Sequence, residues 1–340
     1  MTLDEISITL VYSAMAVYAI AFIAYAIDLA RRSAVATRAA DEAKAAAAAA
    51  PVAVGAGAAA AAGTGGTGAS TSTPAKPVSG AARGAASVAY GRSPALRVGV
   101  AMTVIAWALH LAADVTRGLA AGRVPWANMY EFALTGTLVI TTVYLLVLVV
   151  SKHDLRFLGT FVTGLVLVLL GIATVNFYVE VAPLPPALQS AWLVIHVFVA
   201  TLGTGFFAVG AGLSIAQLLQ ARRESGRPGL AFLRTFPSST VLENLAYRVV
   251  VVGFAFWTFT LIAGAIWAEH AWGRYWGWDT KEVWTFIIWV LFAGYIHARA
   301  TRGWRGARSA WLAIVGFSAV LFNFTIVNLF FKGLHAYSGL

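Results

Sequence analysis

Long apolar runs separated by short polar segments dominate the chain. Eight runs of roughly twenty apolar residues recur, and this is the length that a helix needs to cross a bilayer. They cover residues 7–30, 97–115, 131–150, 156–176, 189–220, 248–267, 283–299 and 310–331. In lipid each backbone polar group must be satisfied within its own segment, so helices are the expected form. The pattern predicts an all-α polytopic membrane protein with about eight transmembrane helices.

Composition agrees with this class. Of the 340 residues, 60% are hydrophobic and 11% are charged, whereas a soluble domain carries roughly 25% charged residues. Asp4 and Glu5 precede the first apolar run, which is also too long for the core of a cleavable signal peptide. We therefore expect the first run to remain as a helix, with the N-terminus outside.

Basic residues orient the predicted bundle. With an external N-terminus, the cytoplasmic segments 31–97, 151–156, 221–248 and 298–308 hold 19 of the 24 Lys and Arg residues. This is the positive-inside bias, so we expect the C-terminus outside as well. The net charge of +10 then reflects topology and contact with anionic head groups of the lipid bilayer, and no nucleic-acid partner is expected.

Residues 31–96 differ in composition from the rest. From Ala45 to Tyr90 the only charges are Lys76 and Arg83, among Ala, Gly, Ser, Thr, Pro and Val. Such a stretch predicts a disordered cytoplasmic linker. A transmembrane span there is rejected because it would place the later basic loops outside. The predicted division is an N-terminal helix (1–30), the linker (31–96) and a seven-helix membrane domain (97–340).

Histidines are the candidate ligands, because the chain has no cysteine and so excludes disulfides and Cys-ligated metal sites. His196 lies near the outer end of the fifth span, and His335 follows the last one. His297 ends the seventh span, roughly 25 Å below Asp279 at 1.5 Å per helical residue. Two ligands outside and one inside suggest two haem positions, although a helix–helix hydrogen bond would also explain a histidine within a span. The remaining histidines divide into His153 and His270, expected to face water, and His110, which stays ambiguous.

A tryptophan-rich segment lies between these histidines. Six of the 12 tryptophans fall in residues 267–289, around the stretch WGRYWGWDTKEVW. An interfacial aromatic belt is one interpretation. However, Gly273 and Gly277 separate the rings, and flat aromatic faces with small spacers suit stacking on a planar macrocycle. Arg274 and Lys281 could then pair with the propionates of haem.

The segment resembles the WWD signature of haem-handling proteins, specifically the CcsA/ResC branch of System II cytochrome c biogenesis. The matching residues are Trp272, Gly273, Tyr275, Trp276, Trp278, Asp279, Lys281, Glu282, Trp284, Ile287, Trp289, Tyr295, His297 and Arg299. Thr280 stands where the family usually has proline, and GRVPWANMYE at 122–131 is similar to a second family stretch. The resemblance covers residues 97–340.

The resemblance implies a function and site residues. His196 and His335 would ligate haem b at the external aromatic platform formed by Trp272, Gly273, Tyr275, Trp276, Trp278 and Asp279. His297 would ligate a second haem in the membrane, with its other ligand supplied by a CcsB/Ccs1/ResB-family partner. The activity implied is passage of haem from the inner to the outer face of a bacterial plasma membrane, followed by its covalent attachment to the C-x-x-C-H thiols of apocytochrome c. His196, His335 and Asp279 are the candidate catalytic residues, with Asp279 and Glu282 orienting the loop or protons.

Three alternatives remain open at this point. A System I haem-delivery protein also has a WWD loop, but it would lack the K-E-x-W continuation and the histidine of the seventh span. A dihaem quinol oxidoreductase would pair its histidines within the bundled helices. A non-catalytic scaffold with an interfacial tryptophan belt would bind no haem and would show no Soret band.

Overall fold

The regular elements of the structure are all helices. The computed structural model describes residues 1–49, 93–184, 186–227, 230–301 and 303–335. The helices are α1 (Leu3–Ala49), α3 (Pro94–Ala121), α4 (Met129–Val150), α5 (Gly159–Asn176), α6 (Ala191–Glu224), α7 (Ser239–Trp272), α8 (Thr280–Ala300), α9 (Ala307–Phe322) and α10 (Asn328–Phe330), with a π-helical turn at Asn323–Val327. Within these residues, 8 helices are long and apolar enough to cross a membrane. The prediction of an all-α protein with eight spans is confirmed.

The first helix is longer than predicted. It continues to Ala49, so residues 31–49, which were expected to belong to an unstructured linker, are helical. Alanine has the highest helix propensity, and this stretch is rich in it. The linker also ends earlier than residue 96, because Ser93 caps α3 at its first turn. Residues 50–92, the remainder of the predicted linker, lie outside the described residues.

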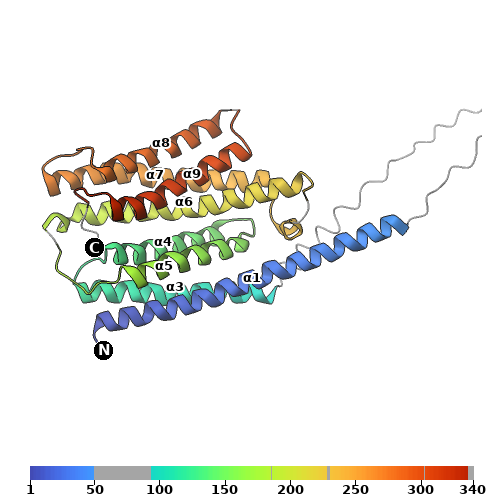
Figure 1. Ribbon diagram of the computed structural model, residues 1–340, viewed down its shortest axis with the longest axis horizontal. Coiled ribbons are helices and arrows are strands. Elements are labelled where there is room, and N and C mark those ends of the chain that lie inside the picture. The colour runs from blue at the N-terminus through green and yellow to red at the C-terminus, as the bar shows by residue number, and fades with distance from the viewer. Residues whose placement is uncertain (50–92, 185, 228–229, 302, 336–340) are drawn as a thin grey trace, which may run out of the picture.

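Helix α6 is the centre of the bundle. It lies between α4 on one side and α7 and α9 on the other (Figure 1). Small residues allow this close packing: a Cβ at Gly210 would come within 2.6 Å of the Val250 side chain. Of the most apolar stretch of α6, 56% is buried, against 17% for α8, which contacts α7 and α9 at the edge of the bundle. Helix α8 therefore leaves most of its surface to lipid or to another chain.

The start of α1, the α7–α8 loop and the end of α9 lie together at one end of the bundle, on the left in Figure 1. We call this the site end. Basic residues gather at the opposite end, which holds the end of α6 with Arg222 and Arg223. The structure thus brings the predicted external segments to one side.

A buried ionic network holds the site end together. Arg117 of α3 and Glu131 of α4 are fully buried, and Arg117 Nε lies 3.0 Å from Glu131 Oε1. Arg117 also pairs with Asp4 of α1 at 2.5 Å, and Arg123 pairs with Glu131 at 2.7 Å. The Ala127 amide donates to the same carboxylate at 2.9 Å. The network therefore fixes the loop between α3 and α4 against three helices.

His110 is a structural residue. Its Nε2 lies 2.9 Å from the carbonyl oxygen of Leu134, and its Nδ1 lies 3.4 Å from the Tyr18 hydroxyl. Both ring nitrogens are therefore used in joining α3 to α4 and α1, and the imidazole is fully buried. This resolves the sequence ambiguity in favour of a helix–helix hydrogen bond.

Candidate functional site

Two local signals shape the loop between α7 and α8. Gly273 ends α7 in the left-handed region (φ 69°), where its amide donates to Glu269. Asp279 begins α8 with a capping box, in which Glu282 accepts from the Asp279 amide at 3.0 Å. Trp278, just before the cap, also has a positive φ of 60°, which is strained for a bulky residue. The sequence thus builds a short, stiff loop at the site end.

Arg274 and Glu282 stabilise this loop from within. Glu282 Oε2 accepts from the Gly277 amide at 2.8 Å, and Oε1 lies 3.5 Å from Arg274 Nη1. A Cβ at Gly277 would overlap the Arg274 guanidinium. Gly277 therefore makes room for an arginine of its own loop. Arg274 was predicted to pair with a propionate of haem, but in the structure it is already paired with Glu282.

His196 of α6 is held in one orientation. Its Nδ1 donates to the carbonyl oxygen of Thr260 on α7 at 3.0 Å. Its ring stacks on Trp267, with 5.7 Å between centroids and 18° between planes. Gly264 permits this approach, because a Cβ there would lie 2.7 Å from His196 Cε1. Since a carbonyl can only accept, Nδ1 carries the proton and Nε2 keeps its lone pair.

His335 is held in the same tautomer by a different group. Its Nδ1 donates to Asp279 Oδ2 at 2.7 Å, and the Leu334 amide donates to Oδ1 at 3.0 Å. Its ring meets Trp267 and Trp272 edge to face at 5.4 and 4.9 Å. Asp279 is thus the anchor that folds the segment after the last span back onto the loop.

Electrostatics favour a neutral imidazole beside an ionised carboxylate. The hydrogen bond from His335 lowers the pKa of Asp279 to about 2. Burial lowers the pKa of His335 below its ordinary value, even with Asp279 next to it. At neutral pH the Nε2 of His335 is therefore unprotonated. A carboxylate that holds Nδ1–H in this way is a common support for a metal-binding histidine.

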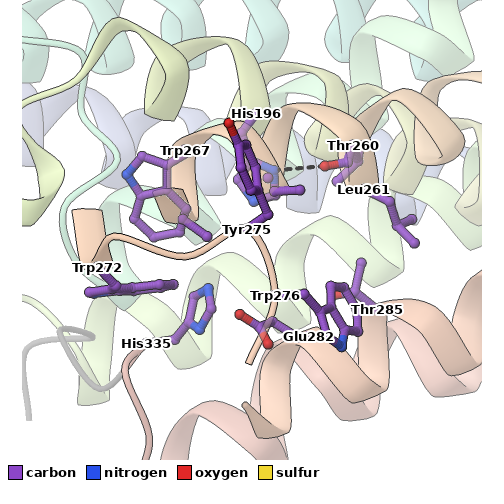
Figure 2. Close-up of a pocket in the computed structure, with 13 residues that line it drawn as sticks. His196, Thr260, Leu261, Trp267, Trp272, Tyr275, Trp276, Glu282, Thr285 and His335 are labelled. Carbon is purple, nitrogen blue, oxygen red and sulfur yellow. Dashed lines mark hydrogen bonds between the residues drawn. The ribbon is translucent and has the colours of Figure 1, made fainter. Parts of the chain in front are cut away.

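Both imidazoles line the same cavity (Figure 2). His196 and His335 lie on opposite sides of it, with Trp267 and Trp272 along one wall and Trp276 across from them. The space measures about 400 Å³ including its mouth. A second cavity of about 600 Å³ shares His196, Trp267 and His335 with the first. Its other lining residues are Trp126, Ala127, Asn128, Met129, Phe132, Leu188, Leu193, Val197, Lys281 and Asn328.

The donor set fits axial ligation of haem iron. Each histidine has one nitrogen tied and one free, and neither free nitrogen makes a hydrogen bond within the described residues. In the same part of the chain no group of three His, Cys, Asp or Glu side chains could hold a bare metal ion. Two imidazoles and a set of indoles suit a flat macrocycle.

The structure separates the predicted platform into parts. Trp272, Tyr275 and Trp276 line the first cavity. Trp278 is 73% exposed and meets Trp276 edge to face, outside both cavities. Gly273 also lies outside them. A glycine suits this position because the backbone there is in the left-handed region. Asp279 reaches the cavity only through His335.

His297 lies apart from this site. It is exposed, near the end of α8 that is opposite the site end, as its position in the sequence predicts. Its side chain makes no hydrogen bond or ion pair within the described residues. His270 and His153 are both exposed and line neither described cavity, as expected for residues that face water.

Sequence reasoning missed Trp267 and Gly264 as site residues. Trp267 contacts both histidines, yet in the sequence it reads as an interfacial tryptophan at the end of a span. Gly264 lies three residues earlier, on the same helix, where a glycine carries no chemical signal. The available signal was the spacing of Thr260, Gly264 and Trp267, which places all three on one face of α7.

Gly264→Ala should uncouple stability from ligand binding. The added methyl group would displace the His196 ring, so we expect haem affinity at this site to fall by about tenfold or more. The thermal midpoint should change little, because alanine favours a helix over glycine by about 1 kcal/mol and this offsets the loss of the His196–Thr260 hydrogen bond. Haem titration followed by absorbance, with a thermal scan, measures both. Gly136→Ala is the matched control, since a Cβ there meets nothing within 4 Å. Equal haem affinity in the two variants would contradict the packing argument.

Comparison with known proteins identifies the family. A family model described as "Cytochrome C assembly protein" matches residues 126–335, which include every residue lining the two cavities. The chain belongs to this cytochrome c assembly family. The match begins at Trp126 and ends at His335, so α1, the linker and α3 lie outside it.

Individual relatives refine the assignment. The chain is 38% identical over 245 residues to a cytochrome c biogenesis protein CcsA of Guillardia theta, covering 66% of this chain and 80% of that protein. It is 35% identical over 265 residues to a CcsA of Synechococcus elongatus, covering 65% and 81%. The chain is thus a CcsA-type cytochrome c biogenesis protein, and its role lies in cytochrome c maturation. This assignment favours neither the quinol oxidoreductase nor the scaffold alternative.

A solved structure shares the fold. The cytochrome c heme lyase CcmF superposes with a TM-score of 0.61 at 16% identity, and the match covers 95% of this chain. This chain spans 47% of the length of that protein. This chain and the larger protein CcmF therefore share a helical arrangement. The relatives found by sequence are CcsA proteins.

Proposed function

We propose that this protein is the membrane subunit of a System II cytochrome c synthase, which presents haem b for attachment to apocytochrome c. The observation that supports this proposal most strongly is the arrangement of His196 and His335. Each is tied through Nδ1, each keeps Nε2 free, and both line one cavity walled by indoles. Bis-imidazole ligation would hold haem there, and the aromatic walls would cover its faces.

Attachment in this site would depend mainly on positioning. A thiol of the acceptor's C-x-x-C-H motif adds across a vinyl group of haem: a sulfur–carbon bond forms, the thiol proton goes to the neighbouring carbon, and no group leaves. The reaction therefore needs an aligned vinyl edge more than a nucleophile–base pair in the protein. Asp279 would act as a positioning residue by holding His335. Tyr275, 62% exposed on the wall of the first cavity, lies where an acceptor would approach.

His297 would ligate a second haem with help from another chain. It lies exposed on α8, the span with the smallest buried share. A bis-imidazole site there would need its second ligand from outside, which fits a partner membrane protein of the CcsB/Ccs1/ResB family. Haem would then reach the outer site after binding at the inner one.

We further propose a bacterial plasma membrane location with the site end outside. The basic residues at the opposite end support this orientation through the positive-inside rule. The site end would then face the compartment in which apocytochrome c receives its haem.

Co-expression with a ResB-type partner, purification of the complex, haem staining and an absorbance spectrum test the proposal. We expect a low-spin Soret spectrum and holocytochrome c when an acceptor is supplied. A complex without a Soret band would reject the proposal.

His297→Ala tests the inner site in the same complex. We expect the total haem of the purified complex to fall by about half or more, because the inner site loses a ligand and also supplies the outer site, while haem added from outside still binds His196 and His335. Pyridine haemochrome quantitation measures the change. Unchanged haem content with an unchanged spectrum would make His297 a structural residue.

A further inference from the structure

The two cavities at the site end are neighbours. They meet at His196, Trp267 and His335, which line both. A macrocycle ligated by both imidazoles would therefore extend one edge into each cavity. Which edge enters which cavity depends on charge.

The second cavity contains a cation without a partner. Lys281, in the first turn of α8, lines it, and within the described residues its ammonium group makes no hydrogen bond or ion pair. The nearby carboxylate of Asp279 is already occupied by the His335 imidazole and the Leu334 amide. Lys281 is half-buried, and an unpaired ammonium group that faces a cavity favours an anionic ligand there.

The first cavity has the opposite character. Glu282 lines it, and the carboxylate Oε1 has no hydrogen-bond partner among the described residues. That oxygen is instead ion-paired with Arg274 Nη1 at 3.5 Å, and Arg274 is not part of the lining. No Lys or Arg lines this cavity. A ligand carboxylate would therefore meet a carboxylate already paired with Arg274 here, and an unpaired ammonium group in the second cavity.

Resting on the proposed function, we infer that haem binds with its propionates in the second cavity, paired with Lys281, and with its vinyl edge in the first. The propionates and the vinyl groups occupy opposite edges of the macrocycle, so one anchor determines the position of both. The vinyl edge then lies between Trp276 and the exposed Tyr275, on the side open to incoming thiols. Lys281 is thereby assigned as a ligand-binding residue, and Arg274 is assigned to the loop.

Haem and its dimethyl ester, which lacks both negative charges, test this orientation. Their affinities are compared in the full complex with its partner, for the native protein, Lys281→Met, Lys281→Arg and the control Lys332→Met. Lys332 is an exposed cation at the same end of the bundle. For the native protein and for Lys332→Met we expect esterification to weaken binding about tenfold or more, as for loss of a charge-assisted bond.

For Lys281→Met we expect haem and its ester to bind within about threefold of each other, whereas Lys281→Arg should retain the native ratio. The affinity ratio of haem to its ester is measured within each variant. A variant that binds both ligands more weakly therefore keeps the native ratio. An ester effect as large in Lys281→Met as in the native protein would overturn the inference. The proposed function fails separately, if His196→Ala leaves the spectrum of bound haem unchanged.

Discussion

His196→Ala and His335→Ala are each expected to lower holocytochrome c formation by at least about 100-fold. Loss of a group that merely supports a metal ligand already costs about 10- to 100-fold, and these variants remove a ligand itself. Free imidazole should restore part of the activity, because the truncated side chain leaves a space of its own shape beside Thr260 or Asp279. Haem staining of the acceptor cytochrome, with and without imidazole, measures both effects.

His153→Ala is the matched control, since this histidine is exposed in the loop between α4 and α5. It should leave holocytochrome c formation unchanged. Normal holocytochrome c in both cavity variants would remove the basis for the ligand assignment. A loss without any response to imidazole, together with a changed elution volume, would indicate a folding defect.

Glu131→Ala is expected to destabilise the protein by about 3–5 kcal/mol, the usual effect of breaking a buried ion pair. The substitution would leave the guanidinium of Arg117, fully buried, without its closest α4 partner, and would free Arg123 and the Ala127 amide. The loop carrying Trp126 and Asn128 would lose its attachment, and with it one wall of the second cavity. Thermal unfolding of the purified protein in detergent measures the loss.

Glu180→Ala provides the control, because this carboxylate is exposed at the same end of the bundle. It should leave the thermal midpoint within a degree or two of the native value, as surface changes usually do. Equal midpoints for Glu131→Ala and the native protein would show that the network contributes little to stability.

Part of the site was predictable from the chain alone. The capping box of Asp279 and Glu282 and the left-handed Gly273 are local signals, and each involves only residues within four positions along the chain. Depth along α8 separated His297 from the other histidines, because helical rise is a constant. The convergence of His196 and His335 was an expectation from topology, and the cavity confirms it.

Other parts needed contacts between distant segments. Arg274 and Lys281 look equivalent as cations beside the tryptophans, but one lies against Glu282 and the other lines a cavity. Similarly, His110 and His196 are both histidines within spans. Only the neighbours show that His110 uses both nitrogens, whereas His196 uses one.

The sequence by itself determined the eight spans, the membrane class and the family motif, because each depends on composition or spacing within a short stretch. Tertiary structure alone decided which nitrogen of each imidazole stays free, why Gly264 must be small, and which cation lines the second cavity. Those properties arise where α6, α7, α8 and the segment after the last span pack together. Residues as far apart in the sequence as 196 and 335 line one cavity there, and no local sequence pattern predicts that contact.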